Sequence, residues 1–236
     1  MKVLLLQSGS RRGSTRRCVE DYIDALGAYE KVELKEFIFP RDLPSFCRGC
    51  FSCFLNGEDT CPDSKYTLPI ISSMEEADIV IIASPVYGLD VSGQIKALID
   101  HLCFMWLSHR PNPKLFDKVG VVFTTAAGMG LKNTSRTMKN SFFFWGFKRI
   151  FTFKKAVAAS KWEEVSERNK KIISKRIGKI AEKSAAAVSG INTLSHSLTF
   201  RLMWRMMRGM MKKNDWNPAD RAHWEALGWL DKTKPF

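Results

Sequence analysis

The sequence has no long hydrophobic run: no segment approaches the roughly 18 apolar residues of a membrane-spanning helix. Its first residues, MKVLLLQ, turn polar too early for a secretory signal. Acidic residues are scarce, with 24 Asp and Glu against 37 Lys and Arg, a net charge of +13. We therefore expect a cytoplasmic protein with a solvated basic surface and no nucleic-acid partner, and a membrane surface is the less favoured partner. A length of 236 residues suffices for one α/β domain with an extension.

Several motifs that would define an enzyme class are also missing. Neither the phosphate-binding G-x-x-x-x-G-K-[ST] nor the dinucleotide-binding G-x-G-x-x-G occurs. The four histidines show no H-x-x-x-H or H-E-x-x-H spacing, which argues against a histidine-bound metal. No catalytic acid, base or nucleophile is indicated by these patterns.

The hydrophobic pattern alternates between strands and helices. Unbroken or alternating apolar runs predict five strands, the last of them weak, at residues 2–7, 32–35, 78–83, 119–123 and 150–158. Helical spacing predicts four intervening or following helices at residues 19–26, 95–102, 133–145 and 162–188. Such alternation is typical of a doubly wound α/β fold with a parallel sheet.

Three of the buried strands run into loops rich in small or hydroxyl residues. These loops occupy residues 8–15, 84–88 and 124–130. Ligands of parallel sheets lie at the carboxyl ends of the strands, so we expect the three loops to form one binding site. The first loop, SGSRRGST, combines hydroxyls, two arginines and a helix start, which suits a phosphate, although Ser and Thr at this place also serve as ordinary helix caps.

Two of these loops carry a family resemblance. Residues 9–15, GSRRGST, resemble the phosphate loop of the NADPH-dependent FMN reductases, and residues 84–100, SPVYGLDVSGQIKALID, resemble a longer segment of the same family. The resemblance implies a flavodoxin-like five-stranded parallel sheet that binds FMN. It also implies the ligands of each part of FMN: Ser10, Arg12, Ser14 and Thr15 for the phosphate; Pro85, Val86, Tyr87 and Gly88 around the isoalloxazine ring; Thr125, Ala126 and Gly128 at its far edge.

Four of the six cysteines are clustered in the pattern C-x2-C-x2-C-x7-C: Cys47, Cys50, Cys53 and Cys61. Structural zinc usually uses two separated cysteine pairs, so the compact spacing suits a four-thiolate iron–sulfur cluster better. The spacing resembles that of the iron-sulfur flavoproteins, which implies a [4Fe-4S] cluster. Free thiols, a redox disulfide or another metal remain open alternatives. Cys18 and Cys103 fall on predicted helices, and we expect both to be buried as hydrophobic side chains.

Residues 191–236 lie beyond the flavodoxin-like unit that we expect over residues 1–190. This extension holds five of the ten methionines, between Met203 and Met211, on a predicted amphipathic helix with a basic stripe of arginines and one lysine. Packing on its own domain, a subunit interface and membrane binding are alternative roles for the methionine face. Asn217-Pro218 and Gly228 predict the start and the end of a short last helix.

The sequence therefore indicates an FMN-dependent oxidoreductase that takes electrons from NAD(P)H and assembles as a homo-oligomer, a dimer or a tetramer. The first alternative is an iron-sulfur flavoprotein that takes electrons from a ferredoxin-like donor. The second is a flavodoxin-fold binding or regulatory protein that docks through its C-terminal helix.

Overall fold

The computed structural model describes residues 1–236 except 10–12, 160, 232 and 234. Five strands form one parallel sheet in the order β2-β1-β3-β4-β5. Their bounds are β1 Lys2–Ser8, β2 Glu33–Phe39, β3 Ile79–Ala83, β4 Val119–Ala126 and β5 Arg149–Ala156. This order is the flavodoxin-like one, with the topological switch between β1 and β3. The predicted fold class is confirmed.

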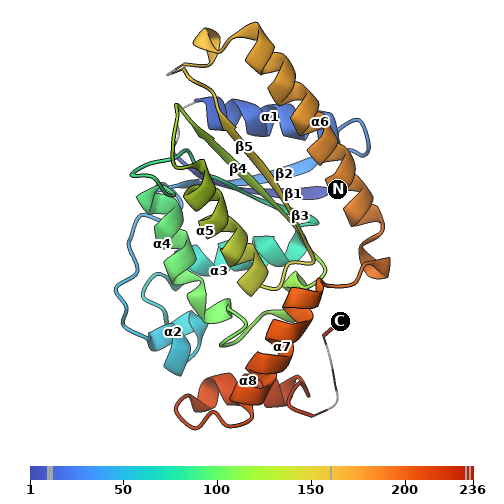
Figure 1. Ribbon diagram of the computed structural model, residues 1–236. Coiled ribbons are helices and arrows are strands. Elements are labelled where there is room, and N and C mark those ends of the chain that lie inside the picture. Colours follow the sequence, from blue (N-terminus) through green and yellow to red (C-terminus); the bar gives the residue numbers. More distant parts are fainter. Residues whose placement is uncertain (10–12, 160, 232, 234) are drawn as a thin grey trace.

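Helices cover both faces of this sheet (Figure 1). The helices are α1 Ser14–Leu26, α2 Ser52–Leu55, α3 Ser64–Glu76, α4 Gly93–His101, α5 Leu131–Phe144, α6 Glu167–Ser189, α7 Leu198–Met211 and α8 Pro218–Ala226. Short 3₁₀ turns lie at Glu58–Thr60, Cys103–Met105, Pro113–Leu115, Trp162–Glu164 and Ile191–Thr193. No helix among the described residues is long and apolar enough to cross a membrane.

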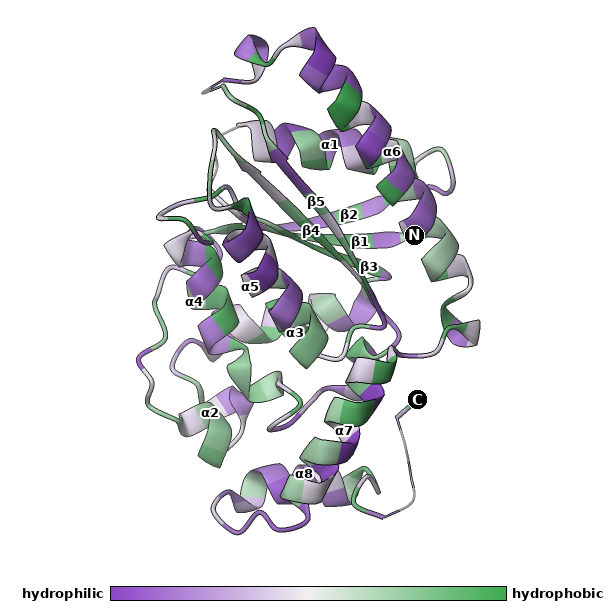
Figure 2. Ribbon diagram, viewed as in Figure 1, coloured by the Kyte–Doolittle hydropathy of each residue, from purple (hydrophilic) through white to green (hydrophobic). Residues whose placement is uncertain are grey.

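The central strands β1, β3 and β4 lack an alternating pattern because both of their faces are buried. Figure 2 shows the hydropathy of the strands. In β1, Val3 and Leu5 pack under α1 and α6, whereas Leu4 and Leu6 pack under α3, α4 and α5. β2 lies at the edge of the sheet and is more exposed, as its alternation predicts. Its last residues extend pairing with β1 as far as Phe39, four residues beyond the predicted end.

Several helices depart from the sequence pattern, among them the short α2, which is not predicted. α3 is absent from the prediction because it contains Pro69, which removes a backbone donor within the helix. The predicted helix over residues 162–188 begins instead at Glu167, where the side chain of Ser166 accepts a hydrogen bond from the Asn169 amide. Residues 162–164 form a separate 3₁₀ turn before it.

The C-terminal segment has its own aromatic core. The Trp204 ring stacks on Trp224 at 4.5 Å between centroids and meets Trp229 edge-on at 4.8 Å. This core also contains Leu107 and Phe116, which precede β4, so α7 and α8 pack on the α/β unit. One of the roles predicted for α7 is packing on its own chain. The face that carries Phe200 and Trp204 packs in this way. A domain boundary at residue 190 stays a prediction.

Gly120 in β4 offers a test of packing between the sheet and α5. A Cβ at this position would lie 2.8 Å from Cγ of Phe142, a fully buried side chain. We expect Gly120→Ala to lower the free energy of unfolding by about 1–3 kcal/mol through overpacking, measured by urea denaturation. Gly178→Ala in α6 is the control, because nothing lies within 4 Å of its Cβ, and the better helix former should be neutral or stabilising. Equal effects of the two substitutions would contradict the packing described here.

Candidate functional site

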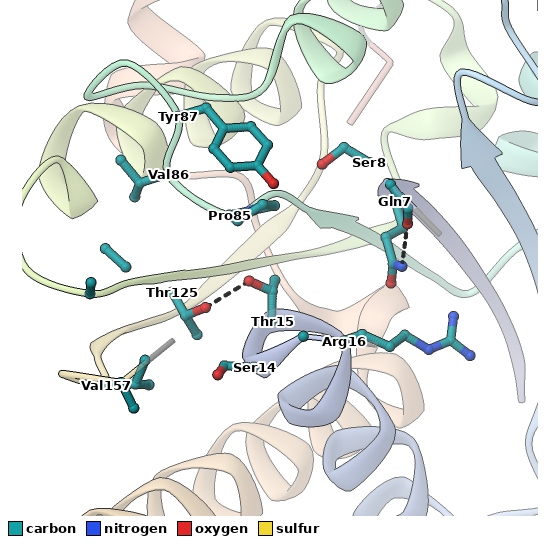
Figure 3. Close-up of a pocket in the computed structure, with 15 residues that line it drawn as sticks. Gln7, Ser8, Ser14, Thr15, Arg16, Pro85, Val86, Tyr87, Thr125 and Val157 are labelled. Carbon is teal, nitrogen blue, oxygen red and sulfur yellow. Dashed lines mark hydrogen bonds between the residues drawn. The ribbon is translucent and has the colours of Figure 1, made fainter. Parts of the chain in front are cut away.

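A cavity of about 220 Å³ lies at the carboxyl edge of the sheet, at the switch point between β1 and β3 (Figure 3). It collects residues from the ends of four strands and the start of α1. The lining residues are Gln7, Ser8, Gly9, Gly13, Ser14, Thr15, Arg16, Pro85, Val86, Tyr87, Thr125, Ala126, Ala127, Val157 and Ala159. The three loops that the sequence predicts to meet therefore do meet.

One end of the cavity is the N-terminus of a helix. α1 begins at Ser14, and no side chain among the described residues caps it, so the first-turn amides have no side-chain partner there. Thr15 and Thr125 are tied together by a 2.7 Å hydrogen bond between their hydroxyls, which joins α1 to β4. Ser8 Oγ, at the end of β1, is buried without a partner among the described residues. Backbone amides and a positive helix end are a chemical match for phosphate oxygens.

Arg16 lines the cavity but has other partners. Its guanidinium forms ion pairs with Glu20 at 2.9 Å and Glu36 at 2.8 Å, and its side chain runs away from Ser14 and Thr15 (Figure 3). Arg16 is therefore neutralised within the protein. The predicted phosphate ligands Ser10 and Arg12 lie outside the described residues, and their role stays a prediction.

The other end of the cavity is formed by a rigid turn that presents Tyr87. Tyr87 and Asp90 exchange two backbone hydrogen bonds of 2.9 and 3.0 Å, and Gly88 and Leu89 between them both have positive φ, as in a tight hairpin turn. The Asp90 carboxylate accepts a 2.8 Å hydrogen bond from the Thr137 hydroxyl of α5, which fixes the turn. The Tyr87 side chain remains 62% exposed, so its ring is available for stacking.

The structure brings most of the predicted FMN ligands together. Nine of the predicted ligands lie among the described residues, and seven of them line the cavity. These seven are Ser14, Thr15, Pro85, Val86, Tyr87, Thr125 and Ala126. Gly88 forms the adjacent turn and Gly128 is exposed, and neither lines the cavity. Outside the three predicted loops, the lining also contains Gln7, Arg16, Val157 and Ala159. The position of Gln7, Val157 and Ala159 near the ends of β1 and β5 is the signal that could have indicated them.

A second cavity, of about 320 Å³, contains the cysteine motif. Its lining includes Cys47, Cys50, Cys53 and Cys61, together with Asp63 and the residues at the end of α4. Cys103 lines it as well, contrary to the expectation of a buried helical side chain, because α4 ends at His101 and the chain turns there. Cys18, in contrast, is fully buried under α6 as expected. Five of the six thiols thus share one cavity.

Two of the thiols in this cavity, Cys53 and Cys103, are poor nucleophiles as they stand. Burial raises the pKa of Cys53 to about 11 and that of Cys103 to about 12, with smaller contributions from the neighbouring cysteines. Redox-active cysteines usually have lowered pKa values, so the environment of these two thiols does not favour disulfide exchange. Metal ions stabilise thiolates and would reverse the effect of burial.

The described residues show no ready site for a single metal ion. Among them, no group of three or more Cys, His, Asp or Glu side chains converges on one metal position. In a four-thiolate cluster each thiolate binds a different iron, so the ligands of a cluster need not converge in this way.

The cysteine loop is held in place from the C-terminal segment. Arg110 donates hydrogen bonds to the backbone carbonyls of Cys53 and Phe54 at the α2 turn, the latter at 2.8 Å. The fully buried Asp220 of α8 accepts from Arg110 at 3.3 Å and hydrogen-bonds His109 Nδ1 at 2.8 Å. On the other side of the cavity, the buried His101 Nε2 lies 3.1 Å from the Asp63 carboxylate. The buried ion pair of Arg110 and Asp220 fixes α2 relative to α8.

The fold and the first cavity define a flavodoxin-like protein with its site at the switch point of the sheet. A family model of the NADPH-dependent FMN reductases matches residues 1–164. This match covers well over half of the chain, and the protein belongs to that family.

Curated relatives and solved structures agree with this assignment. An iron-sulfur flavoprotein of Archaeoglobus fulgidus is 38% identical over 86 residues, which are 36% of this chain and 36% of that protein. One of Methanocaldococcus jannaschii is 40% identical over 103 residues, covering 42% of this chain and 51% of that protein. The chain thus spans about a third to a half of the length of these relatives. An azoreductase of Bacillus anthracis has the same fold, with a TM-score of 0.61 at 14% identity over 78% of this chain and 99% of that one.

The buried pair of Arg110 and Asp220 predicts how the cysteine loop responds to mutation. Asp220→Ala would remove the buried carboxylate partner of Arg110 and leave it only Glu58, which is half exposed and 3.6 Å away. Breaking a buried pair costs about 3–5 kcal/mol. We expect lower stability in urea denaturation and faster reaction of the cavity thiols with a thiol reagent. Asp215→Ala is the control, since Asp215 is 89% exposed and its ion pair with Arg221 is 3.4 Å long. Unchanged thiol reactivity in Asp220→Ala would show that α8 does not hold the loop.

Proposed function

We propose that this protein is an FMN-dependent oxidoreductase that takes electrons from NAD(P)H. The observation that carries the proposal is the convergence on one cavity of the uncapped α1 N-terminus and the exposed Tyr87 ring. The first suits the phosphate of FMN and the second suits the face of its ring. Membership of the NADPH-dependent FMN reductase family supports this reading.

The residues of the cavity have positioning roles in this proposal. Ser14, Thr15 and the α1 amides hold the phosphate, while Pro85, Val86 and Tyr87 enclose the ring. Bound FMN supplies the capacity for hydride and electron transfer. The described lining contains no His, Asp, Glu or Lys, so the protein contributes binding and orientation there rather than an acid or a base.

Exposed apolar side chains beside this cavity support a homo-oligomer. Tyr87, Leu89 and Met129 are 62%, 53% and 75% exposed. A second subunit over these residues would shield the ring from water, and light scattering at micromolar concentration measures whether one is present.

The direct test of the function is the absorbance of the purified protein together with its activity. Twin flavin bands, and oxidation of NADH or NADPH that depends on added FMN, support the proposal. A colourless protein that takes up no FMN contradicts it and favours a binding or regulatory role on the same fold.

Ser14 tests the phosphate end of the cavity. Ser14→Ala removes a hydroxyl at the α1 N-terminus, and we expect FMN binding to weaken by about 1.5–3 kcal/mol, the usual value for a hydrogen bond to a charged group. Riboflavin, which lacks the phosphate, serves as the internal control in the same titration and should bind with unchanged affinity. Equal losses for FMN and riboflavin would place Ser14 away from the phosphate.

An iron-sulfur flavoprotein is the second candidate, favoured by the cavity that five cysteines share. α4 connects the two cavities: the Tyr87 turn precedes it, and Asp100, His101 and Cys103 at its end line the cysteine cavity. Nine helical residues span about 13 Å. A [4Fe-4S] cluster on Cys47, Cys50, Cys53 and Cys61 would therefore lie near the flavin site and suit a ferredoxin-like donor.

Iron content distinguishes this candidate from the first. After anaerobic purification we expect stoichiometric iron and broad absorbance under the flavin bands. Cys50→Ser should remove the iron and leave FMN bound, whereas Cys18→Ala, a matched thiol buried under α6, should retain both. Cys103→Ser should also keep its iron if the four motif cysteines are the ligands. Iron that survives Cys50→Ser would refute the ligand assignment.

A further inference from the structure

Three arginines of α7 line a cavity of about 200 Å³ that neither proposed site uses. Arg201, Arg205 and Arg208 follow one face of the helix, and Ser195, Trp204 and Phe236 complete the lining. The cavity lies toward the amino-terminal edge of the sheet, because Arg149 at the start of β5 donates a 2.9 Å hydrogen bond to the Ser195 carbonyl. This contact places the cavity at the opposite edge of the sheet from the switch-point cavity, and Figure 1 shows α7 near the start of β5.

The positive charge of this cavity is not neutralised by the protein. Among the described residues, no carboxylate lies within 4.0 Å of these three guanidinium groups, whereas Arg16 and Arg110 have acidic partners. The sequence contains no Asp or Glu between Glu182 and Asp215. Like charges three and four residues apart on a helix repel one another, so the arrangement is unfavourable unless an anion relieves it.

Two donor atoms of the lining residues have no acceptor. Trp204 Nε1 and Arg208 Nε are buried without a hydrogen-bond partner in the described structure. Arg208 donates from Nη2 to the Leu230 carbonyl at 3.3 Å, which fixes its guanidinium beside the cavity. Guanidinium groups donate and do not accept, so a ligand that binds the three arginines must carry acceptor oxygens.

We propose that this three-arginine cavity binds the phosphate group of a phosphorylated ligand. Planar arginine donors match phosphate oxygens in pairs, and all three basic lining residues are arginine rather than lysine. Trp204 and Phe236 supply an aromatic wall for the part of the ligand next to the phosphate.

The phosphate has two possible sources that share this chemistry. Leu198, Leu202, Met206 and Met210 form an apolar stripe beside the arginines, all more than half exposed, which suits the headgroup of an anionic lipid. A soluble phosphate ester would use the arginines and the aromatic wall alone. The two sources predict different responses to vesicles and to a small phosphate compound.

The experiment compares charge-matched variants of the full-length, FMN-supplemented protein. The test variant is Arg201→Gln/Arg205→Gln, which changes two exposed residues and keeps Arg208. The control is Lys179→Gln/Lys183→Gln, which removes two charges from the exposed face of α6. Binding is measured by calorimetry with pyrophosphate and by co-flotation with phosphatidylglycerol or phosphatidylcholine vesicles, and circular dichroism verifies folding.

We expect the test variant to lose at least tenfold in affinity while the control retains the native value. Loss of pyrophosphate binding supports the site with a soluble ligand, and loss confined to phosphatidylglycerol vesicles supports it with a lipid. Binding that is equally reduced in both variants shows only a net-charge effect and overturns the proposal, as does the absence of binding to both probes. The comparison does not involve the flavin cavity, so its outcome is independent of the proposed function.

Discussion

Parallel pairing of five strands is the constraint from which the site arises. Every strand carries its carboxyl end to the same edge, and helices must cover both faces because both are apolar. The chain reverses its order between β1 and β3, so the loops after these strands diverge and leave a crevice. The loops can carry glycine, hydroxyl and aromatic residues without cost to the core, since the sheet below them is fixed by the buried residues of β1, β3 and β4.

The pattern-based prediction succeeds where burial alone decides structure. The strands β1, β3 and β4 are unbroken apolar runs, and a run with two buried faces has few alternative structures. The loops at their ends could be assigned to one site from topology alone. Prediction fails where a tertiary contact decides: α3 folds in spite of Pro69, and β2 continues to Phe39 because β1 pairs with it. Cys103 joins the other thiols through the end of α4, which spacing along the chain cannot show.

The cysteine cavity and the switch-point cavity are held in place by different parts of the protein. Its α2 turn is tied by Arg110 to Asp220, and the Asn214 and Asn217 side chains order the turn that begins α8. None of these asparagine or aspartate residues lies in residues 1–164, which match the family model. The sheet therefore explains the first site, whereas the second is held by the C-terminal segment together with the contact between His101 and Asp63.

This separation has a consequence for how the two sites respond to change in the sequence. Residues 198–226 share an aromatic core with Leu107, Phe116 and the end of α5. The N-terminus of α8 reaches the cysteine loop through Asp220, which binds Arg110, and through Asn217, whose Nδ2 donates to the Phe54 carbonyl at 3.5 Å. The flavin cavity, in contrast, is fixed by β1, β4 and the hydroxyl pair Thr15–Thr125. Because the second cavity shares α4 with the first but draws its support from α8, the properties of the cysteine site can vary while the switch-point cavity keeps its form.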